Sequence, residues 1–193
     1  MIGCDGCRPV VTCRYEASII DQPMTSVPAS LPARIPIAPI LIRAGLLTAA
    51  IDGLFSSVLS VAFYGSTVSR LFQGVASTLL GKAALDGGTT TAIIGMLMHV
   101  GVAFAWSSVF LLLNSSSEGL RRTLVRPSGV LGVASVFGPC VWLVMSLVVV
   151  PILLHRPPAI TIRWWIQLVG HAPFVGVPIV GSIASGIAGR RHE

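Results

Sequence analysis

Long runs of apolar residues dominate the chain, and short polar segments separate them. Four of these runs exceed the roughly 18 residues that cross a hydrocarbon core of about 30 Å as an α-helix. They cover residues 35–64, 89–113, 129–154 and 160–187. The pattern therefore predicts an all-α, polytopic membrane bundle with four transmembrane helices, together making up a domain over residues 35–189.

Residues 66–85, between the first two runs, mix polar and apolar residues. Polar side chains such as Arg70, Gln73 and Lys82 alternate there with apolar ones at helical spacing. The apolar positions are Val68, Leu71, Phe72, Val75, Ala76, Leu79 and Ala83. This spacing predicts an amphipathic helix at the membrane interface, and a short extramembrane helix packed on the bundle is an equally good interpretation.

The two ends of the chain differ from the apolar domain. Residues 1–34 contain three of the four cysteines and no apolar period of their own. They are predicted to be a disordered leader, or to result from a translation start assigned upstream of a natural one at Met24. The leader cysteines lack the fourth ligand of a closed zinc site. Residues 190–193 form a basic tail.

Composition strengthens the membrane assignment. Only 10% of the 193 residues are charged, 53% are hydrophobic, and the mean hydropathy is +0.85. Because soluble domains carry about 25% charged residues, an ordinary soluble protein is excluded. The basic residues are not interleaved with aromatic ones, so the lipid bilayer, rather than nucleic acid, is the predicted partner. No complete hydrolytic or nucleotide-binding motif occurs, so an enzyme is not the favoured class.

The distribution of arginine and lysine predicts the orientation. One side of the predicted bundle carries Arg34, Arg43, Arg121, Arg122, Arg126, Arg190 and Arg191. The other side carries Arg70, Lys82, Arg156 and Arg163. The excess on the first side predicts that both termini lie in the cytoplasm. Trp164 and Trp165 are then predicted to anchor the fourth span at the outer interface.

Three ionisable residues lie inside the predicted spans: Asp52, His99 and His171. A charge at the bilayer centre costs at least about 2.5–3.5 kcal/mol on insertion scales, so such residues usually have a specific partner or a function. We therefore treat them as a candidate intramembrane Asp/His cluster.

The residue types leave three interpretations open. Each imidazole could bond to a carbonyl or hydroxyl group of a neighbouring helix, a packing contact of about 0.6–2 kcal/mol. The three groups could form a proton or ion relay. His99 and His171 could instead ligate a haem iron, or a metal ion together with Asp52. Candidate hydrogen-bond partners are Thr48, Ser56, Ser57, Ser107, Ser146 and Gln167.

Residues 43–180 also resemble a known group in their layout. The residues that carry the resemblance are Ala44-Gly45, Ala50-Ile51-Asp52-Gly53, Gln73-Gly74-Val75-Ala76-Ser77, Asp86-Gly87-Gly88 and Gly95 to His99. In these the chain resembles small uncharacterised bacterial inner-membrane proteins, with the YagU-like group as the nearest named relative. The resemblance implies a four-span inner-membrane protein of unknown biochemistry, with a link to acid tolerance. It carries over no catalytic residue and no cofactor.

Two functional classes follow from these patterns. The favoured class is an accessory or structural membrane protein, or a small transport component with the Asp/His cluster at its centre. The alternative is a b-type haem or metal-binding protein that uses His99 and His171. A transport component should have a polar cavity that reaches one face, whereas a haem protein should have both imidazoles on facing helices. Because four spans bury little interior, a homo-oligomer or a larger membrane complex is also expected.

Overall fold

The fold is a bundle of helices. A computed structural model describes residues 37–188, and every regular element in that range is helical. The predicted leader over residues 1–34 and the basic tail over residues 190–193 lie outside the described residues. Four helices in the described part are long and apolar enough to cross a membrane. The prediction of an all-α, multi-pass membrane bundle is confirmed.

The four long helices differ in where π turns interrupt them. The first, Ile37–Phe63, joins α1 (Ile37–Val58) to a π turn, and the second is the single helix α3 (Gly88–Ser116). The third and fourth are each broken by a π turn. The third, Pro127–Leu154, consists of α5 (Pro127–Val144), the π turn Met145–Val149 and α6 (Val150–Leu154). The fourth, Ile162–Ile187, consists of α7 (Ile162–His171), the π turn Ala172–Gly176 and α8 (Val177–Ala188).

Prolines explain two of the three π turns. Pro151 and Pro178 each stand two residues after a π turn and lack the N–H that would bond to the carbonyl four residues earlier. Those carbonyls, of Leu147 and Phe174, lie inside the π turns. The wider turn makes room for the proline ring and lets the helix continue. Pro139 lies within α5 and does not end it.

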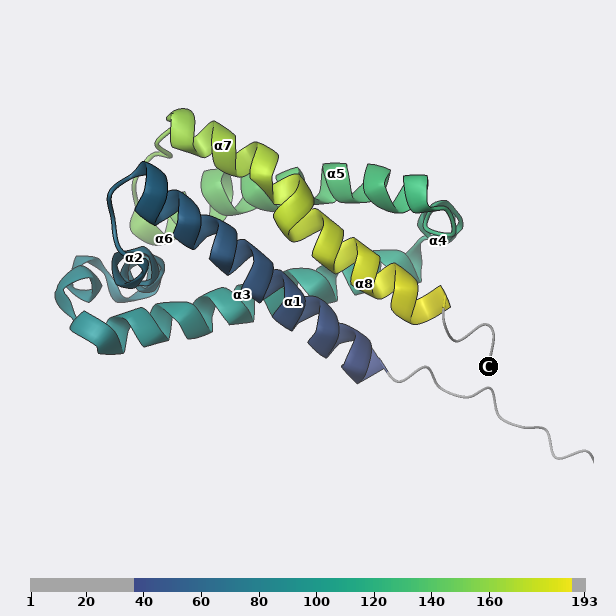
Figure 1. Cartoon of the computed structure of the whole chain (residues 1–193), viewed down its shortest axis with the longest axis horizontal. Helices are drawn as coiled ribbons and strands as arrows, with labels where there is room; N and C mark the ends of the chain where they lie inside the picture. The colour runs from purple at the N-terminus through teal and green to yellow at the C-terminus, as the bar shows by residue number, and fades with distance from the viewer. Residues whose placement is uncertain (1–36, 189–193) are drawn as a thin grey trace, which may run out of the picture. The chain divides into compact units, whose positions relative to one another are not determined.

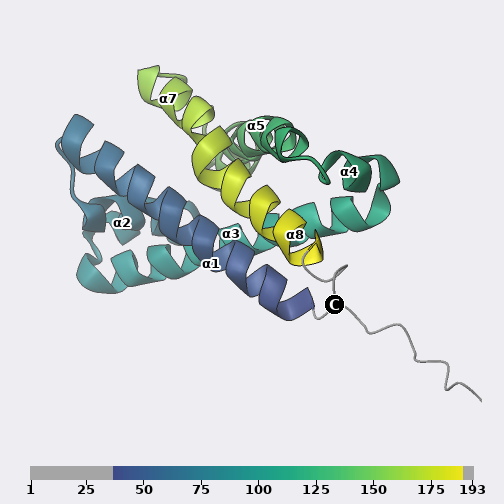
Figure 2. The same cartoon turned by 45° about the vertical axis from the view of Figure 1, so that its right-hand side comes forward.

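The arrangement of the long helices is visible in Figures 1 and 2. In both views α1 and α8 run side by side across α3, and α1 packs against both helices. On the other side α5 packs against α7, α8 and the π turn between them. The start of α1, the end of α8 and α4 (Glu118–Thr123) lie at one end of the bundle, and α2 (Val68–Leu80) lies at the other.

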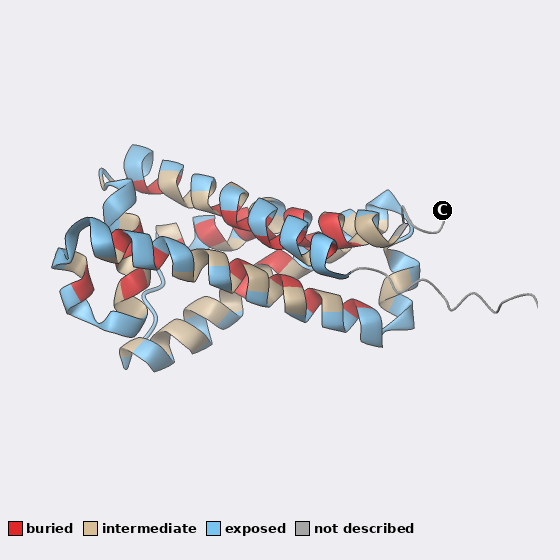
Figure 3. Cartoon of the chain, turned by 90° about the horizontal axis from the view of Figure 1, so that it is seen from below, coloured by how far each residue is buried: buried red, intermediate tan, exposed pale blue. Residues whose placement is uncertain are grey.

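The outer surface is more apolar than parts of the interior. Large hydrophobic side chains such as Leu54, Leu97 and Val169 are exposed on the long helices, whereas Asp52 and Gln167 are buried between them. Figure 3 shows the buried positions gathered on the inward faces and the exposed positions on the outward faces. An apolar outside is what lipid as a solvent requires, because lipid provides no hydrogen bonds.

The segment between the first two spans forms α2 and a 3₁₀ turn, Lys82–Asp86. Thr67 caps α2 by accepting a hydrogen bond from the amide of Arg70 at 3.1 Å. Phe72 and Ala76 are buried where α2 packs against α3, and Gly95 of α3 allows this close approach because any Cβ there would collide with the Phe72 carbonyl. The helix therefore packs on the bundle, and its place at a membrane interface stays a prediction.

Candidate functional site

The interior of the bundle contains one cavity that unites the three ionisable residues predicted from the sequence. It has a volume of about 650 Å³, and all four long helices contribute to its wall. We call it the central cavity. Its lining includes Thr48, Asp52, His99, Trp142, Gln167 and His171, which we call its polar end; Ser56 and Ser146 also line the cavity.

Helical spacing accounts for two parts of the polar end. Thr48 and Asp52 lie one turn apart on α1, so they project from the same face, and both are buried. Gln167 and His171 have the same spacing on α7 and are also buried. The packing of α1 against the π turn that follows α7 brings these two pairs to one site.

Asp52 and His99 form the closest ionisable pair. The Nε2 atom of His99 lies 3.8 Å from Oδ2 of Asp52 and 3.2 Å from the carbonyl oxygen of Ala49. A carbonyl oxygen can only accept a hydrogen bond, so the contact with Ala49 indicates that the neutral His99 ring carries its proton on Nε2. The distance to Asp52 exceeds the roughly 2.7–3.2 Å of an N–H···O hydrogen bond. Asp52 therefore has an imidazole beside it without a full hydrogen bond from it.

His171 is held by its own helix and by a tryptophan. Its Nδ1 atom donates to the carbonyl oxygen of Gln167 at 2.7 Å, which leaves Nε2 as the acceptor of a neutral ring. The ring lies 4.8 Å from that of Trp142, between centroids. Both histidines thus bond to backbone carbonyls. The expectation that Gln167 serves as a partner is met by its backbone, not by its side chain.

Four buried side-chain atoms of the polar end have no hydrogen-bond partner within residues 37–188. They are Thr48 Oγ1, Asp52 Oδ1, Trp142 Nε1 and Gln167 Oε1. An unsatisfied buried polar group costs about 1–3 kcal/mol, and such groups are usually completed by water or a ligand. All four belong to residues that line the central cavity, and the atoms themselves are covered by their neighbours.

The cavity extends from the polar end to one end of the bundle. Arg156, Thr161 and Arg163, in and after the turn that joins α6 to α7, also line it. The turn is exposed, so the cavity reaches the surface there. With 1.5 Å per residue, His171 lies about 12 Å along the helix from Arg163. The Arg163 guanidinium stacks 4.6 Å from the ring centre of Tyr64, which ties the ends of the first and fourth spans together.

An apolar core adjoins the central cavity and shares Val141, Val175 and Ile179 with its wall. Its buried residues are Ile40, Ala44, Phe110, Ala134, Val141, Val175, Ile179, Val180 and Ile183. Several belong to the start of α1, the end of α3 and α8, which places the core toward the end of the bundle where α1 begins. The central cavity is therefore open toward one end of the bundle and blocked by packed side chains toward the other.

Trp164 and Trp165 have different surroundings although they are neighbours. Trp164 is 8% exposed, lines the central cavity and donates from Nε1 to Oγ of Ser146 at 3.0 Å. Trp165 is 54% exposed on the outer surface. The anchoring role predicted for both at the outer interface stays a prediction; Trp165 has the exposure that such a role needs, and Trp164 also belongs to the cavity wall.

The donor sets of the described residues do not favour a metal centre. No group of three His, Cys, Asp or Glu side chains within residues 37–188 is placed to hold a metal ion. His99 and His171 each use one ring nitrogen on a backbone carbonyl. A metal-bound imidazole makes the same kind of bond with its second nitrogen, so the haem or metal alternative stays a prediction.

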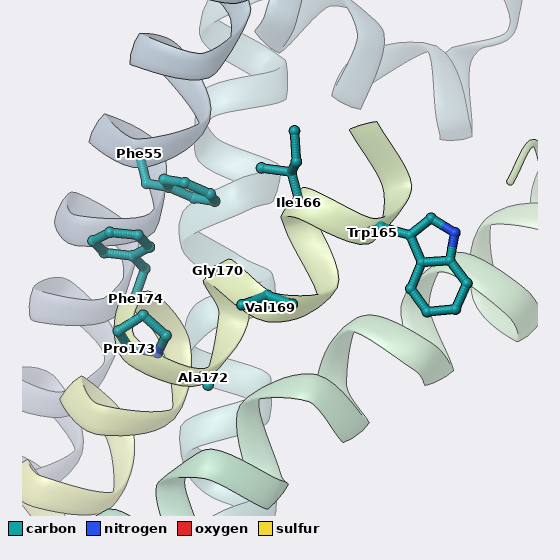
Figure 4. A pocket seen from close by; sticks show the side chains of 8 residues that line it. All are labelled: Phe55, Trp165, Ile166, Val169, Gly170, Ala172, Pro173 and Phe174. Atoms are coloured by element: carbon teal, nitrogen blue, oxygen red, sulfur yellow. The ribbon is translucent and has the colours of Figure 1, made fainter. Parts of the chain in front are cut away.

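A second hollow, on the outside of the bundle, is apolar. Figure 4 shows it beside α1 and α7, where the rings of Phe55 and Phe174 stack with their centroids 4.3 Å apart. Val169 and Trp165 border it and are largely exposed. Its volume of about 660 Å³ is similar to that of the central cavity, but it contains no ionisable side chain. It has the character of a lipid-facing surface.

Sequence reasoning missed one residue of the polar end. Trp142 belongs to an apolar run, and its position gave no sign that it faces His171. Gln167 carried a usable signal, because a lone glutamine one turn before an intramembrane histidine shares its face. These two residues supply two of the four unpaired atoms.

Comparison of the chain with protein-family models, with curated proteins and with solved structures finds no match. The resemblance to the YagU-like group stays a prediction. The class defined by the fold is that of an integral membrane protein with four candidate spans. A more specific function has to be argued from the central cavity.

Proposed function

We propose that the chain is a small transport component of the bacterial inner membrane, in which Asp52, His99 and His171 exchange protons with the contents of the central cavity. One observation carries the proposal. Asp52, His99 and His171 all line one cavity, whose wall also includes residues of the exposed turn at one end of the bundle. A polar cavity that reaches one face is what distinguishes a transport component from a purely packed bundle.

The cost of the cluster supports a role beyond packing. A buried Asp and two His inside a membrane bundle are expensive unless they are fully paired. Here the Asp52 carboxylate has one oxygen without a partner and the other 3.8 Å from His99. Hydroxyl or apolar side chains would satisfy packing at lower cost. The retained polar groups are better explained by protons or solutes that enter and leave.

The one-sided opening supports a transport cycle. The side with the most arginine contains the start of α1, so the positive-inside rule places the apolar core toward the cytoplasm and the cavity mouth toward the outside. Opening the cytoplasmic side requires α5 and α8 to separate. The π turns Met145–Val149 and Ala172–Gly176 adjoin both helices and supply points where the helix axes can change direction.

The proposal is tested by proton flux in liposomes. Purified protein is reconstituted with a pH-sensitive dye inside, and a potassium gradient with valinomycin drives protons inward. We expect a flux that depends on pH, because the relay groups exchange protons. Asp52→Asn and His99→Ala should lower the initial rate at least about tenfold, as expected when a relay group is removed.

A matched control is Asp86→Asn, which removes an exposed carboxylate outside the cavity. It should leave the flux unchanged. Wild-type flux equal to that of protein-free liposomes would overturn the transport proposal and favour an accessory or structural role. Flux that Asp52→Asn and His99→Ala leave unchanged would sink the relay.

A further inference from the structure

The polar end of the central cavity offers a carboxylate together with groups that can donate as well as accept. Asp52 accepts while its carboxyl group is ionised, and Thr48 Oγ1 can accept as well as donate. The Gln167 amide has an acceptor oxygen and a donor nitrogen, and Trp142 Nε1 is purely a donor. Thr48, Asp52 and Gln167 are buried. A guest with N–H groups can therefore bond to Asp52 at this end of the cavity.

The ring protons of the two histidines are already used. His99 donates from Nε2 to the Ala49 carbonyl, and His171 donates from Nδ1 to the Gln167 carbonyl. In the neutral rings the remaining nitrogens are acceptors.

Asp52 provides the charge that selects among donor-bearing guests. Its carboxylate faces His99 from α3 and His171 from α7, and a neutral imidazole does not balance a negative charge. The permanent cations that line the cavity, Arg156 and Arg163, lie at the mouth, about 12 Å or more along the helices from His171. A cationic guest at the polar end would meet an unbalanced carboxylate, whereas an anionic guest would be repelled by it.

The aromatic side chains of the cavity wall also favour a cationic guest. Trp106, Trp142 and Trp164 line the cavity, and their ring faces attract cations. The rest of the wall is mainly apolar, with residues such as Val102, Val141 and Ile179. The volume of about 650 Å³ lies within the range of small-molecule sites. This combination suits a compact molecule with a charged head and an apolar or aromatic body.

We infer that the polar end of the central cavity binds the ammonium group of a small amphipathic amine, with Asp52 as its counter-ion. The Asp52 carboxylate accepts the ammonium hydrogens, and the body lies against the tryptophans. The inference rests on the proposed function in that it names the class of solute that the transport component takes. It is tested by binding, independently of flux.

The probe is 2-phenylethylammonium, titrated into the full-length protein in lipid nanodiscs and followed by calorimetry and tryptophan fluorescence. 2-Phenylethanol is its neutral isostere and phenylacetate its anionic counterpart. Hexylammonium tests an amine without a ring. We expect saturable binding of both ammonium ions, at least about tenfold tighter than the alcohol or the anion, as expected for a buried charge pair.

Variants locate the site. Asp52→Asn keeps the shape of the side chain and should weaken ammonium binding at least about tenfold while leaving the affinity for 2-phenylethanol unchanged. Gln167→Met should weaken ammonium binding to a smaller extent. Asp86→Asn, outside the cavity, should bind like the wild type. Circular dichroism and gel filtration confirm that each variant is folded.

Several results would overturn the inference. Absence of saturable binding for both ammonium ions would do so, as would equal affinity for 2-phenylethylammonium and 2-phenylethanol. Wild-type ammonium affinity in Asp52→Asn would place any binding elsewhere. If the amines fail to bind while Asp52→Asn abolishes proton flux, the proposed transport stands and the ammonium site falls. If the amines bind in a way that depends on Asp52 but no flux is measured, the ammonium site stands and the proposed transport falls.

Discussion

The Nε2 atom of His99 lies 3.8 Å from a carboxylate oxygen of Asp52, yet it donates its hydrogen bond to the carbonyl oxygen of Ala49, on the same helix as Asp52. The neutral imidazole thus holds α3 against α1 without pairing fully with the acid. Asp52 faces His99 and His171, and the permanently cationic side chains that line the cavity are Arg156 and Arg163 at its mouth. A proton added to His99 would convert this contact into an ion pair.

Two substitutions of His99 separate its structural and titrating roles. His99→Ala removes the interhelical hydrogen bond and should lower the free energy of unfolding by about 1–2 kcal/mol. His99→Gln keeps an N–H donor near Ala49 and should retain most of that stability, but glutamine does not titrate. Unfolding in sodium dodecyl sulfate measures the first effect, and the pH profile of liposome flux measures the second. A wild-type pH profile in His99→Gln would exclude His99 as the titrating group.

Gly53 sets the distance between α1 and the His99 ring. A Cβ at this position would lie 3.4 Å from Nε2 of His99, which is ordinary contact with the polar nitrogen that bonds to Ala49. Gly53→Ala should fit without a clash, so the fold is kept, and we expect a several-fold lower proton flux because the methyl group covers part of this nitrogen. Gly101→Ala on α3 is the matched control, because its Cβ meets open space. Alanine there should add helix stability of about 1 kcal/mol and leave flux unchanged. Equal flux in both variants would show that the Gly53 contact is unimportant.

The number and approximate position of the spans could be predicted from the sequence because lipid imposes long apolar runs. The charged candidates could also be found, because Asp52, His99 and His171 stand out against such runs. Their partners could not, since Ala49 and Gln167 contribute backbone carbonyls that every residue has. The rotation of each helix was equally hidden. It places Trp164 inside and Trp165 outside, although the two are about 100° apart on one helix.

The different surroundings of these two tryptophans predict that their substitution affects stability to different extents. Trp164→Phe removes the hydrogen bond to Ser146 and part of the cavity wall, and should lower the free energy of unfolding by about 1–2 kcal/mol. Trp165→Phe changes an exposed side chain and should cost less than about 0.5 kcal/mol. Detergent unfolding of the two variants compares them directly. A larger loss for Trp165→Phe would contradict the burial of Trp164.

Close approach of helices depends on Gly138 of α5. Any Cβ there would collide with the backbone carbonyl of His171, so α5 and α7 would have to separate next to the polar end. Gly138→Ala should lower the free energy of unfolding by about 1–3 kcal/mol and also weaken ammonium binding. Gly132→Ala on the same helix is the control, because no atom lies within 4 Å of its Cβ. If the two variants were equally stable, the close contact between α5 and α7 at Gly138 would be contradicted.

The orientation of the cavity is the last prediction, and it decides from which side a solute would enter. In a variant with all native cysteines replaced, Ala159→Cys lies in the exposed turn at the mouth, and Ser116→Cys lies at the opposite end of the bundle. The positive-inside rule places the mouth outside. A membrane-impermeant maleimide should therefore label Ala159→Cys in spheroplasts and label Ser116→Cys only after permeabilisation. The opposite pattern would turn the mouth toward the cytoplasm, and the proposed transport component would then take up its solute from inside the cell.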